Sequence, residues 1–304
     1  MSDLTTVGVD LAKNVIVISA TDKSGRKILS RQFSFAGFGE WAANLPPCTF
    51  GMEACSCSHY WARRLSDYGH TVRLIAGEFV NPFRKSRSIK TDRNDAQAIL
   101  TAVRQPDMRF VSIKSVEQQS MLVWHRMRAG FIQDQVALMN RMRGLLAEFG
   151  IWLRRSPSAL RQALTQLQGD ERLPTRVRPI LIEAQQQLHE LEQRIERCDV
   201  EVGVHAKQSE AAQRIVVLNG VGPVTASAVI ATVPRATDFK NGRQMAAWIG
   251  LVPSQRSSGG QARLGSITKR GDAYLRRLLV QGACSAMLAA QRRAPESDLA
   301  FSSG

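Results

Sequence analysis

The chain is poor in several features, and each scarcity excludes a class of protein. None of its 304 residues belongs to an apolar run of roughly 18 residues, so we expect no membrane-spanning helix. Its first residues lack the basic and apolar segments of a signal peptide. Acidic residues number 26 against 41 basic ones, which leaves a net charge of +15. Because a strong positive field attracts polyanions, we expect nucleic acid rather than a membrane as the partner.

Cysteine is also scarce, and its five residues are scattered unevenly. An odd number without a regular spacing indicates reduced thiols rather than a disulfide framework. Cys55, Cys57 and His59 suggest zinc ligands at first sight, but no second Cys or His pair follows at zinc-finger spacing. We therefore interpret them as small buried residues that follow a strand.

The residues that are present predict three segments, the first of which is a domain of residues 1–112. Short β-rich runs at 5–9, 15–19 and 28–35 are separated by turn residues and predict strands joined by hairpins. Further strand-like runs at 48–52 and 71–75 alternate with helical patterns at 38–44 and 60–68. Strands that first meander and then alternate with helices indicate a mixed α/β sheet.

Residues 113–211 form the second predicted segment, a helical linker and dimerisation region. Its strand signal disappears, and prolines interrupt it at residue 157 and again at residues 174–179. An apolar stripe recurs at intervals of three or four residues, formed by Leu181, Ala184, Leu188, Leu191 and Ile195. Two long helices fit this pattern, either as an antiparallel coiled-coil arm or as an ordinary helical bundle packed on the sheet domain. We expect the arm to promote self-association.

Residues 212–304 form the third predicted segment, which is mainly helical, punctuated by glycine and basic. Gly220 and Gly222 precede a small-residue helix at 224–232, as in helix-hairpin-helix modules, where glycine amides approach a phosphate. A plain packing turn explains the same pattern equally well. Between residues 253 and 294 one acid, Asp272, faces eight basic residues, which are Arg256, Arg263, Lys269, Arg270, Arg276, Arg277, Arg292 and Arg293. This imbalance predicts a phosphate-binding surface, to which we add the basic residues Arg84, Lys85, Arg87 and Lys90 of the first segment.

Four carboxylates suggest a metal site in the first segment. Asp10 and Glu53 each end a strand-like run, and Asp92 and Asp95 are three residues apart, so a helix would place them on one face. A helix laid across the edge of the sheet would bring all four around one or two Mg²⁺ ions, which prefer carboxylate oxygens and assist phosphodiester chemistry. Taken singly, each acid has an ordinary explanation as a turn residue or a helix N-cap.

These residues carry a resemblance to a known family. Residues 9–13 (VDLAK), 51–54 (GMEA) and 90–96 (KTDRNDA) resemble the DEDD motifs of bridge-RNA-guided insertion-sequence transposases, the recombinase family that includes the Piv invertases. A second block is similar to the same family in the same order, at residues 218–222, 247–253, 257–260, 264–265 and 269–276. The resemblance runs from about residue 5 to about residue 292. Asn94 and the Ser-Gly-Gly form of the serine motif are similar to the subgroup whose guide is called a seekRNA.

The resemblance implies a fold and a mechanism. The N-terminal domain would have a RuvC-like fold of the ribonuclease H type, in which Asp10, Glu53, Asp92 and Asp95 hold Mg²⁺. The C-terminal transposase domain would supply a serine that attacks DNA and forms a covalent phosphoserine intermediate. A non-coding guide RNA would pair with donor and target DNA, and the protein would act as a dimer assembling to a tetramer. Such an enzyme would work in the bacterial cytoplasm, associated with the nucleoid when active.

Ser258 matches the position of the family's nucleophile, and Ser257 is the alternative. From spacing alone, a flexible Ser-Gly loop without chemistry is the better interpretation, and only the resemblance reverses it. A nucleophilic serine needs assistance, and Arg256 and Arg263 would stabilise charge on the phosphorane. The family also leads us to expect more C-terminal helix than the polar tail of residues 295–304.

Two other functions remain open from the sequence. A metal-dependent, structure-selective DNA nuclease of the Holliday-junction resolvase kind would use the four acids and water, leaving the serines idle. A non-catalytic nucleic-acid-binding protein would need only the basic surface.

Overall fold

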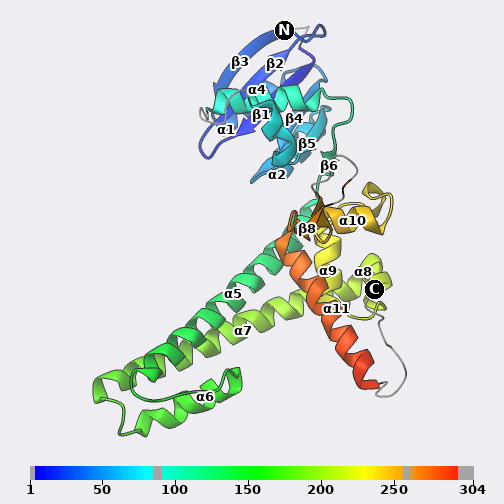
Figure 1. Cartoon of the computed structure of the whole chain (residues 1–304). Helices are drawn as coiled ribbons and strands as arrows, with labels where there is room; N and C mark the ends of the chain where they lie inside the picture. Colours follow the sequence, from blue (N-terminus) through cyan, green and yellow to red (C-terminus); the bar gives the residue numbers. More distant parts are fainter. Residues whose placement is uncertain (1–3, 85–90, 256–260, 262, 294–304) are drawn as a thin grey trace. The chain divides into compact units, whose positions relative to one another are not determined.

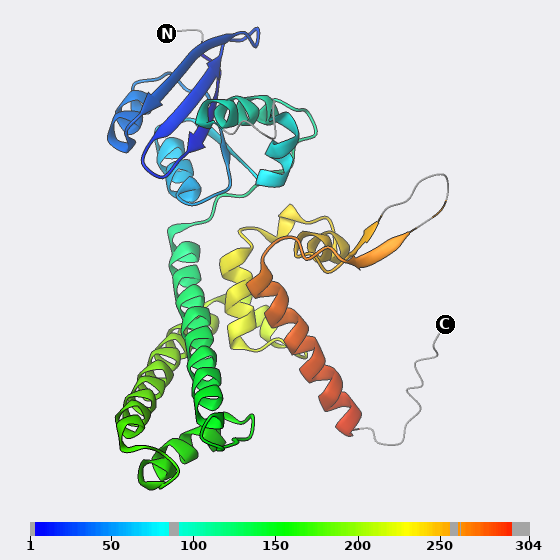
Figure 2. The same ribbon diagram turned by 60° about the vertical axis from the view of Figure 1, so that its left-hand side comes forward.

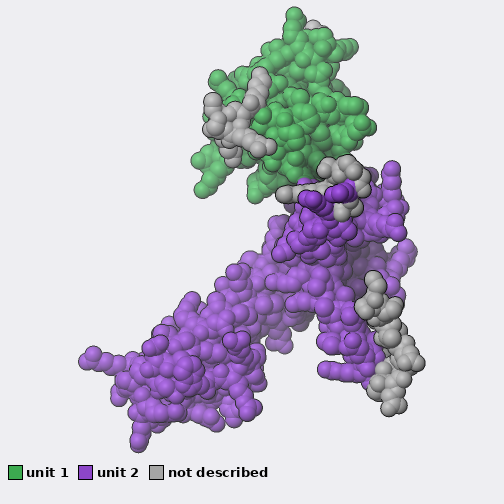
Figure 3. Space-filling view, in the orientation of Figure 1, with its two compact units in different colours: residues 1–114 green, residues 115–304 purple. Residues whose placement is uncertain are grey.

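The computed structural model describes residues 4–84, 91–255, 261 and 263–293. The chain divides into two compact units, residues 1–114 and 115–304 (Figure 3). The first unit ends close to the predicted boundary at residue 112, and the two predicted later segments fall within one unit. Within the described ranges, no helix is both long enough and apolar enough to cross a membrane.

Unit 1 is built on a six-stranded mixed sheet with the order β3-β2-β1-β4-β5-β6 (Figure 1). Its strands are β1 (Thr6–Leu11), β2 (Ile16–Thr21), β3 (Lys27–Phe33), β4 (Thr49–Glu53), β5 (Thr71–Ile75) and β6 (Phe110–Val111). The first three strands pair antiparallel, whereas β4 is parallel to β1 and β5 is parallel to β4. Its helices are α1 (Phe35–Ala43), α2 (Ser58–Asp67), α3 (Gly77–Val80) and α4 (Asp92–Val103), with a 3₁₀ turn at Asn81–Phe83. The predicted mixed α/β sheet is confirmed. The prediction that Cys55 and Cys57 are buried is wrong, because both lie exposed between β4 and α2.

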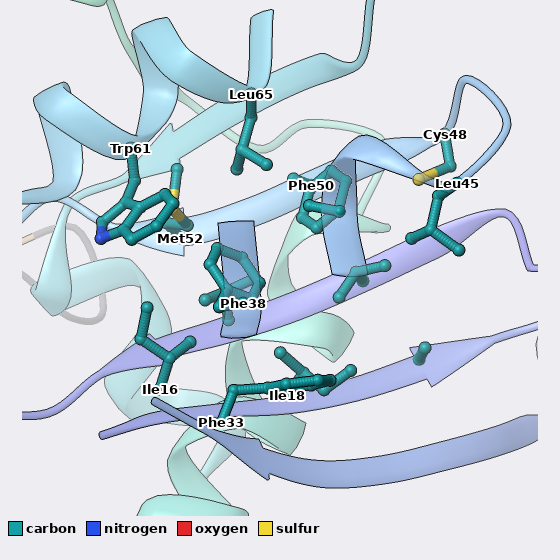
Figure 4. Packing of buried hydrophobic residues seen from close by; sticks show 14 of the residues in the cluster. Ile16, Ile18, Phe33, Phe38, Leu45, Cys48, Phe50, Met52, Trp61 and Leu65 are labelled. Atoms are coloured by element: carbon teal, nitrogen blue, oxygen red, sulfur yellow. The ribbon is translucent and has the colours of Figure 1, made fainter. Parts of the chain in front are cut away.

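One face of the sheet carries the main hydrophobic core. Because side chains alternate along a strand, Val7 and Val9 of β1 and Phe50 and Met52 of β4 all point to the same face. They pack against α1 and α2, and Phe38 and Trp61 from these helices meet edge to face with ring centroids 4.8 Å apart (Figure 4). This core fixes the register of the strands that carry the candidate site.

The opposite face is covered by α4, and two glycines allow it to approach closely. Gly8 of β1 lies directly beside Gly51 of β4 in the parallel register. A Cβ atom on Gly8 would lie 2.4 Å from the carbonyl oxygen of Ala96, and one on Gly51 would lie 2.8 Å from Cβ of Val103. The backbone of α4 therefore rests on the strands with no side chain between them at Gly8.

Unit 2 begins with two long helices that lie side by side in both views (Figures 1 and 2). They are α5 (Val116–Ala147) and α7 (Arg178–Gln208), with α6 (Pro157–Gln166) and 3₁₀ turns at Leu167–Gly169 and Thr175–Val177 between them. A capping box of Ser115 and Gln118 starts α5. The predicted stripe on α7 packs against α5 and α6 through buried residues, which are Leu181, Ala184, Leu188 and Leu191. The two predicted long helices are confirmed.

The remainder of unit 2 is mainly helical. Its elements are α8 (Glu210–Val216), α9 (Pro223–Thr232), a 3₁₀ turn at Ala236–Asp238, α10 (Gly242–Trp248), β7 (Pro253–Gln255), β8 (Leu264–Ile267) and α11 (Ala273–Arg293). Gly220, with φ of +83°, joins α8 to α9, and a Cβ atom there would lie 2.4 Å from the carbonyl oxygen of Gly282 in α11. The predicted turn is thus a backbone packing point against α11.

Candidate active site

The fold of unit 1 brings the four acids to the same face of the sheet. Asp10 lies two residues after Gly8 and Glu53 two residues after Gly51, so both carboxylates point to the face that α4 covers. Thr91 caps α4 by accepting a hydrogen bond from the Asn94 amide, which places Asp92 and Asp95 in the first turn of the helix. The predicted helix across the sheet is therefore present, with its acidic end over the two strand ends.

Burial and charge together change the acidity of Asp10. Its pKa is raised to about 6, first because the half-buried carboxylate is poorly hydrated. The negative charges of Asp95, Asp92 and Glu53 raise it further, and Arg84 opposes them. This mutual influence indicates that the four carboxylates share one electrostatic environment.

An arginine lies among these carboxylates. Arg84 follows the 3₁₀ turn Asn81–Phe83, and its Nε atom lies 2.8 Å from Oδ1 of Asp95. Its Nη2 atom lies 3.4 Å from Oε2 of Glu53. On the other side of Glu53, a Cβ atom on Gly77 would lie 2.6 Å from Oε1, so the carboxylate has little freedom there.

The four carboxylates are chemically suitable ligands for Mg²⁺, but they are not grouped as the ligands of a bound metal ion are. Carboxylate oxygens are the hard ligands that this cation prefers. Among the described residues, however, no group of three or more His, Cys, Asp or Glu side chains is arranged to hold a metal ion. The positive charge between Glu53 and Asp95 is the guanidinium of Arg84.

In the absence of divalent cations, the negative charge of Asp10 should destabilise unit 1. Replacing Asp10 by Asn should stabilise unit 1 at pH 8 by about 1–2 kcal/mol, allowing for the part of the carboxylate that water still reaches. The reason is that a pKa raised from 3.8 to about 6 means that wild-type protein loses stability as the pH rises from about 4 to about 6. Thermal unfolding in EDTA at pH 4, 6 and 8 would show a gain from the substitution that is absent at pH 4 and full at pH 8.

The matched control is Asp22→Asn. The Ser24 hydroxyl and the Arg26 amide donate hydrogen bonds to the Asp22 carboxylate, so its pKa is lowered and its charged form is favoured. The substitution at residue 22 should give no gain at pH 8. A loss of stability in the Asp10 variant at pH 8 would contradict the proposed repulsion.

The predicted nucleophiles lie in the connection between β7 and β8. Ser257, Ser258 and Arg256 are outside the described residues, as are Lys85, Arg87 and Lys90. The strands on either side pair antiparallel, with Gln255 opposite Leu264, and Arg263, which directly precedes β8, is exposed. The two ends of the serine segment are thus held together by a short hairpin.

A backbone cluster anchors this hairpin to α10 and α11. The Lys269 amide donates to the Gly250 carbonyl over 3.1 Å, and a Cβ atom on Gly271 would lie 2.1 Å from the Trp248 carbonyl oxygen. Arg276 donates from Nη1 to the carbonyl oxygens of Ile249 and Arg270, at 2.8 and 2.6 Å. Arg276 therefore supports the backbone, and its predicted contact with nucleic acid stays a prediction.

The other basic residues of the third segment differ in their surroundings. Lys269 and Arg270 are exposed in the turn before α11. Arg277 is exposed on α11 and lies over the ring of Tyr274, 5.6 Å from its centroid. Gly222 is the N-cap of α9 and has open space where a Cβ would lie, unlike Gly220. Lys269, Arg270 and Arg277 are thus accessible to a phosphate, and the phosphate-binding surface stays a prediction.

A buried polar network in unit 2 was missed by sequence reasoning. His125 Nε2 and His205 Nδ1 each lie 2.9 Å from Oγ of Ser227, and His125 Nδ1 lies 3.0 Å from the Tyr274 hydroxyl. Burial lowers the pKa of His125 to about 4, so the ring is neutral. The network links α5, α7, α9 and α11, and its central residues His125 and Ser227 are fully buried. No local motif marks it, since its members are far apart in sequence.

Comparisons with known proteins show that the chain is similar to transposases of insertion sequences. Residues 212–297 match the model described as the transposase IS116/IS110/IS902 family, and residues 7–151 match a second model, a transposase of the DEDD IS110 kind. A probable family 20 transposase of Pseudomonas aeruginosa is 44% identical over 92% of this chain and 83% of its own length. The transposase for insertion sequence element IS1328 of Yersinia enterocolitica is 38% identical, with the same coverage of both chains. The transposase for insertion sequence element IS1111A of Coxiella burnetii is 36% identical over 93% of this chain and 78% of its own length.

Proposed function

Because the chain belongs to the IS116/IS110/IS902 transposase family and is a DNA transposase of an insertion sequence, we propose that it joins donor and target DNA under the guidance of a non-coding RNA. The guide would be a bridge RNA or seekRNA that pairs with both DNAs, so base recognition would lie in RNA pairing. The net charge of +15 supports a protein that holds the backbones of several nucleic acids at once.

The observation that carries the proposal is the common face of the acids. Asp10, Glu53, Asp92 and Asp95 are the residues that would hold Mg²⁺. The first turn of α4, which carries Asp92 and Asp95, lies over the strand ends that carry Asp10 and Glu53, and this supports a RuvC-like site. The sheet order β3-β2-β1-β4-β5 supports a fold of the ribonuclease H type. A bound Mg²⁺ would neutralise phosphate charge and assist the attacking and leaving oxygens.

Ser258, with Ser257 as the alternative, would make the covalent bond to DNA. The serine oxygen would attack phosphorus while a DNA oxygen leaves, so that a protein phosphodiester replaces one in the strand. Arg276 donates hydrogen bonds to the carbonyl oxygens of Ile249 and Arg270, and these bonds support a rigid attachment for the hairpin that carries the serines. Exposed Arg263, Lys269, Arg270 and Arg277 are among the described residues that we assign to nucleic-acid backbones.

The paired helices α5 and α7 would act as a coiled-coil arm in a dimer that assembles to a tetramer. Both helices expose apolar side chains on their outer surface, among them Val123, Met127, Val200 and Val204. Such residues support self-association, because an unpaired apolar helix face is covered in most assemblies. The enzyme would act on the bacterial nucleoid.

RNA dependence is the direct test of this proposal. Purified protein, donor DNA and target DNA should recombine only when a transcript of the DNA flanking the coding region is added. Changing the bases of the RNA loop that pairs with the target should move the insertion to the matching new site, as sequencing of the junctions would show. Recombination of equal efficiency without RNA, or at an unchanged site, would contradict RNA guidance.

A further inference from the structure

Arg84 makes an unusual set of contacts for a residue next to a catalytic cluster. Its Nε lies 2.8 Å from Asp95 Oδ1 and its Nη2 lies 3.4 Å from Glu53 Oε2, so one guanidinium bridges acids from α4 and β4. Its Nη1 donates over 2.6 Å to Oδ1 of Asn81, which aims the group at the carboxylates. Planar, forked geometry makes arginine well suited to such a bridge.

The acids need a positive partner in this arrangement. Asp95 is only 5% exposed, and a carboxylate buried to that extent is costly unless a cation pairs with it. Arg84 provides that charge from a side chain that is itself 28% exposed. The guanidinium therefore neutralises the cluster and still has an open path to solvent.

A divalent cation held by Glu53 and Asp95 would share these carboxylates with the Arg84 guanidinium. Arg84 already contacts one oxygen of each carboxylate, and two cations at one site repel each other. We propose that Arg84 is a resident counter-ion of Glu53 and Asp95 that competes with the divalent cation and is released when the cation binds. This inference rests on the proposed function, because it concerns the site that we assign to Mg²⁺.

Release would give Arg84 a second use. A guanidinium freed beside the carboxylates remains tethered by the 3₁₀ turn at Asn81–Phe83 and is free to pair with a phosphate oxygen. The predicted contact between Arg84 and nucleic acid would then belong to the metal-loaded state, and the ion pairs with Glu53 and Asp95 to the metal-free state. Activity alone cannot separate these roles, so the test measures metal binding.

The experiment is isothermal titration of Mn²⁺ into the full-length chain freed of metal by EDTA and dialysis. Arg84→Gln should bind Mn²⁺ about fivefold to tenfold more tightly than wild type, because the competing ion pairs are gone. Arg84→Lys keeps one positive charge but loses the fork, and it should bind about twofold to threefold more tightly. Circular dichroism would confirm that both variants are folded, and the Lys variant keeps the test valid if the Gln variant is not.

The matched control is Arg93→Gln. Arg93 is exposed on the first turn of α4, so this change removes the same charge near the acids without touching the bridge. Its affinity for Mn²⁺ should stay within about twofold of wild type. Affinities of the two Arg84 variants equal to or weaker than that of the Arg93 variant would overturn the inference. Absence of Mn²⁺ binding in wild type and all variants would overturn both the inference and the proposed metal site.

Discussion

Replacing Ser258 by Ala is expected to abolish the covalent protein–DNA adduct and to lower recombination by roughly three orders of magnitude or more. The effect is large because removal of the hydroxyl removes the atom that forms the bond to phosphorus. Incubation with end-labelled donor DNA, guide RNA and Mg²⁺, followed by a denaturing gel, would measure the adduct as label that a protease releases. The same reactions, scored for donor–target junctions, would measure recombination.

Ser257→Ala is the matched control, since it removes the same group from the neighbouring residue. It should retain the adduct if Ser258 is the nucleophile, and the reverse pattern would assign the role to Ser257. A Ser258 variant that still cuts DNA without forming an adduct would favour the structure-selective nuclease. A Ser258 variant that still recombines donor and target DNA would exclude the serine mechanism.

The strands of unit 1 could be predicted because their apolar residues alternate between clear turns. The runs at 5–9, 15–19, 48–52 and 71–75 fall within or overlap β1, β2, β4 and β5. The sequence also predicts that Asp10 and Glu53 approach each other, because side chains that leave two neighbouring strands on one face lie close together, and β1 and β4 are neighbours in the sheet. The strands and the acids at their ends could be predicted because each depends on a few consecutive residues.

The rest of the site depends on contacts that no local pattern contains. The position of Arg84 at the start of a basic stretch predicts a contact with nucleic acid, yet the structure pairs it with Glu53 and Asp95, 31 and 11 residues away in the sequence. The sequence around Gly220 fits a phosphate contact and a packing turn equally well, and its close approach to Gly282 depends on the position of α11. Composition indicates that a residue is basic or small, but only the tertiary fold decides what it contacts.

The close contact of α4 with the sheet depends on Gly8, and Gly8→Ala is expected to destabilise unit 1 by about 2–4 kcal/mol. The new methyl group would lie 2.4 Å from the Ala96 carbonyl oxygen and 2.5 Å from the Leu100 amide nitrogen, both backbone atoms of α4. Since backbone cannot rotate away, the helix must move off β1 and carry Asp95 with it. Native-state hydrogen exchange would report this as faster exchange of β1 and β4 amides.

Two matched substitutions separate this clash from the general effect of replacing glycine by alanine. Gly51→Ala should cost less, because its methyl group would meet Cβ of Val103 at 2.8 Å, a longer contact than the 2.4 Å to the α4 backbone at Gly8. Gly130→Ala in α5 meets no atom within 4 Å and should stabilise its helix by about 0.5–1 kcal/mol. The Gly130 variant should therefore be the most stable of the three, the Gly51 variant intermediate and the Gly8 variant the least stable. Recombination should fall most in the Gly8 variant. Equal exchange rates in the Gly8 variant and wild type would show that α4 does not rest on β1, and the shared face of the four acids would then need another explanation.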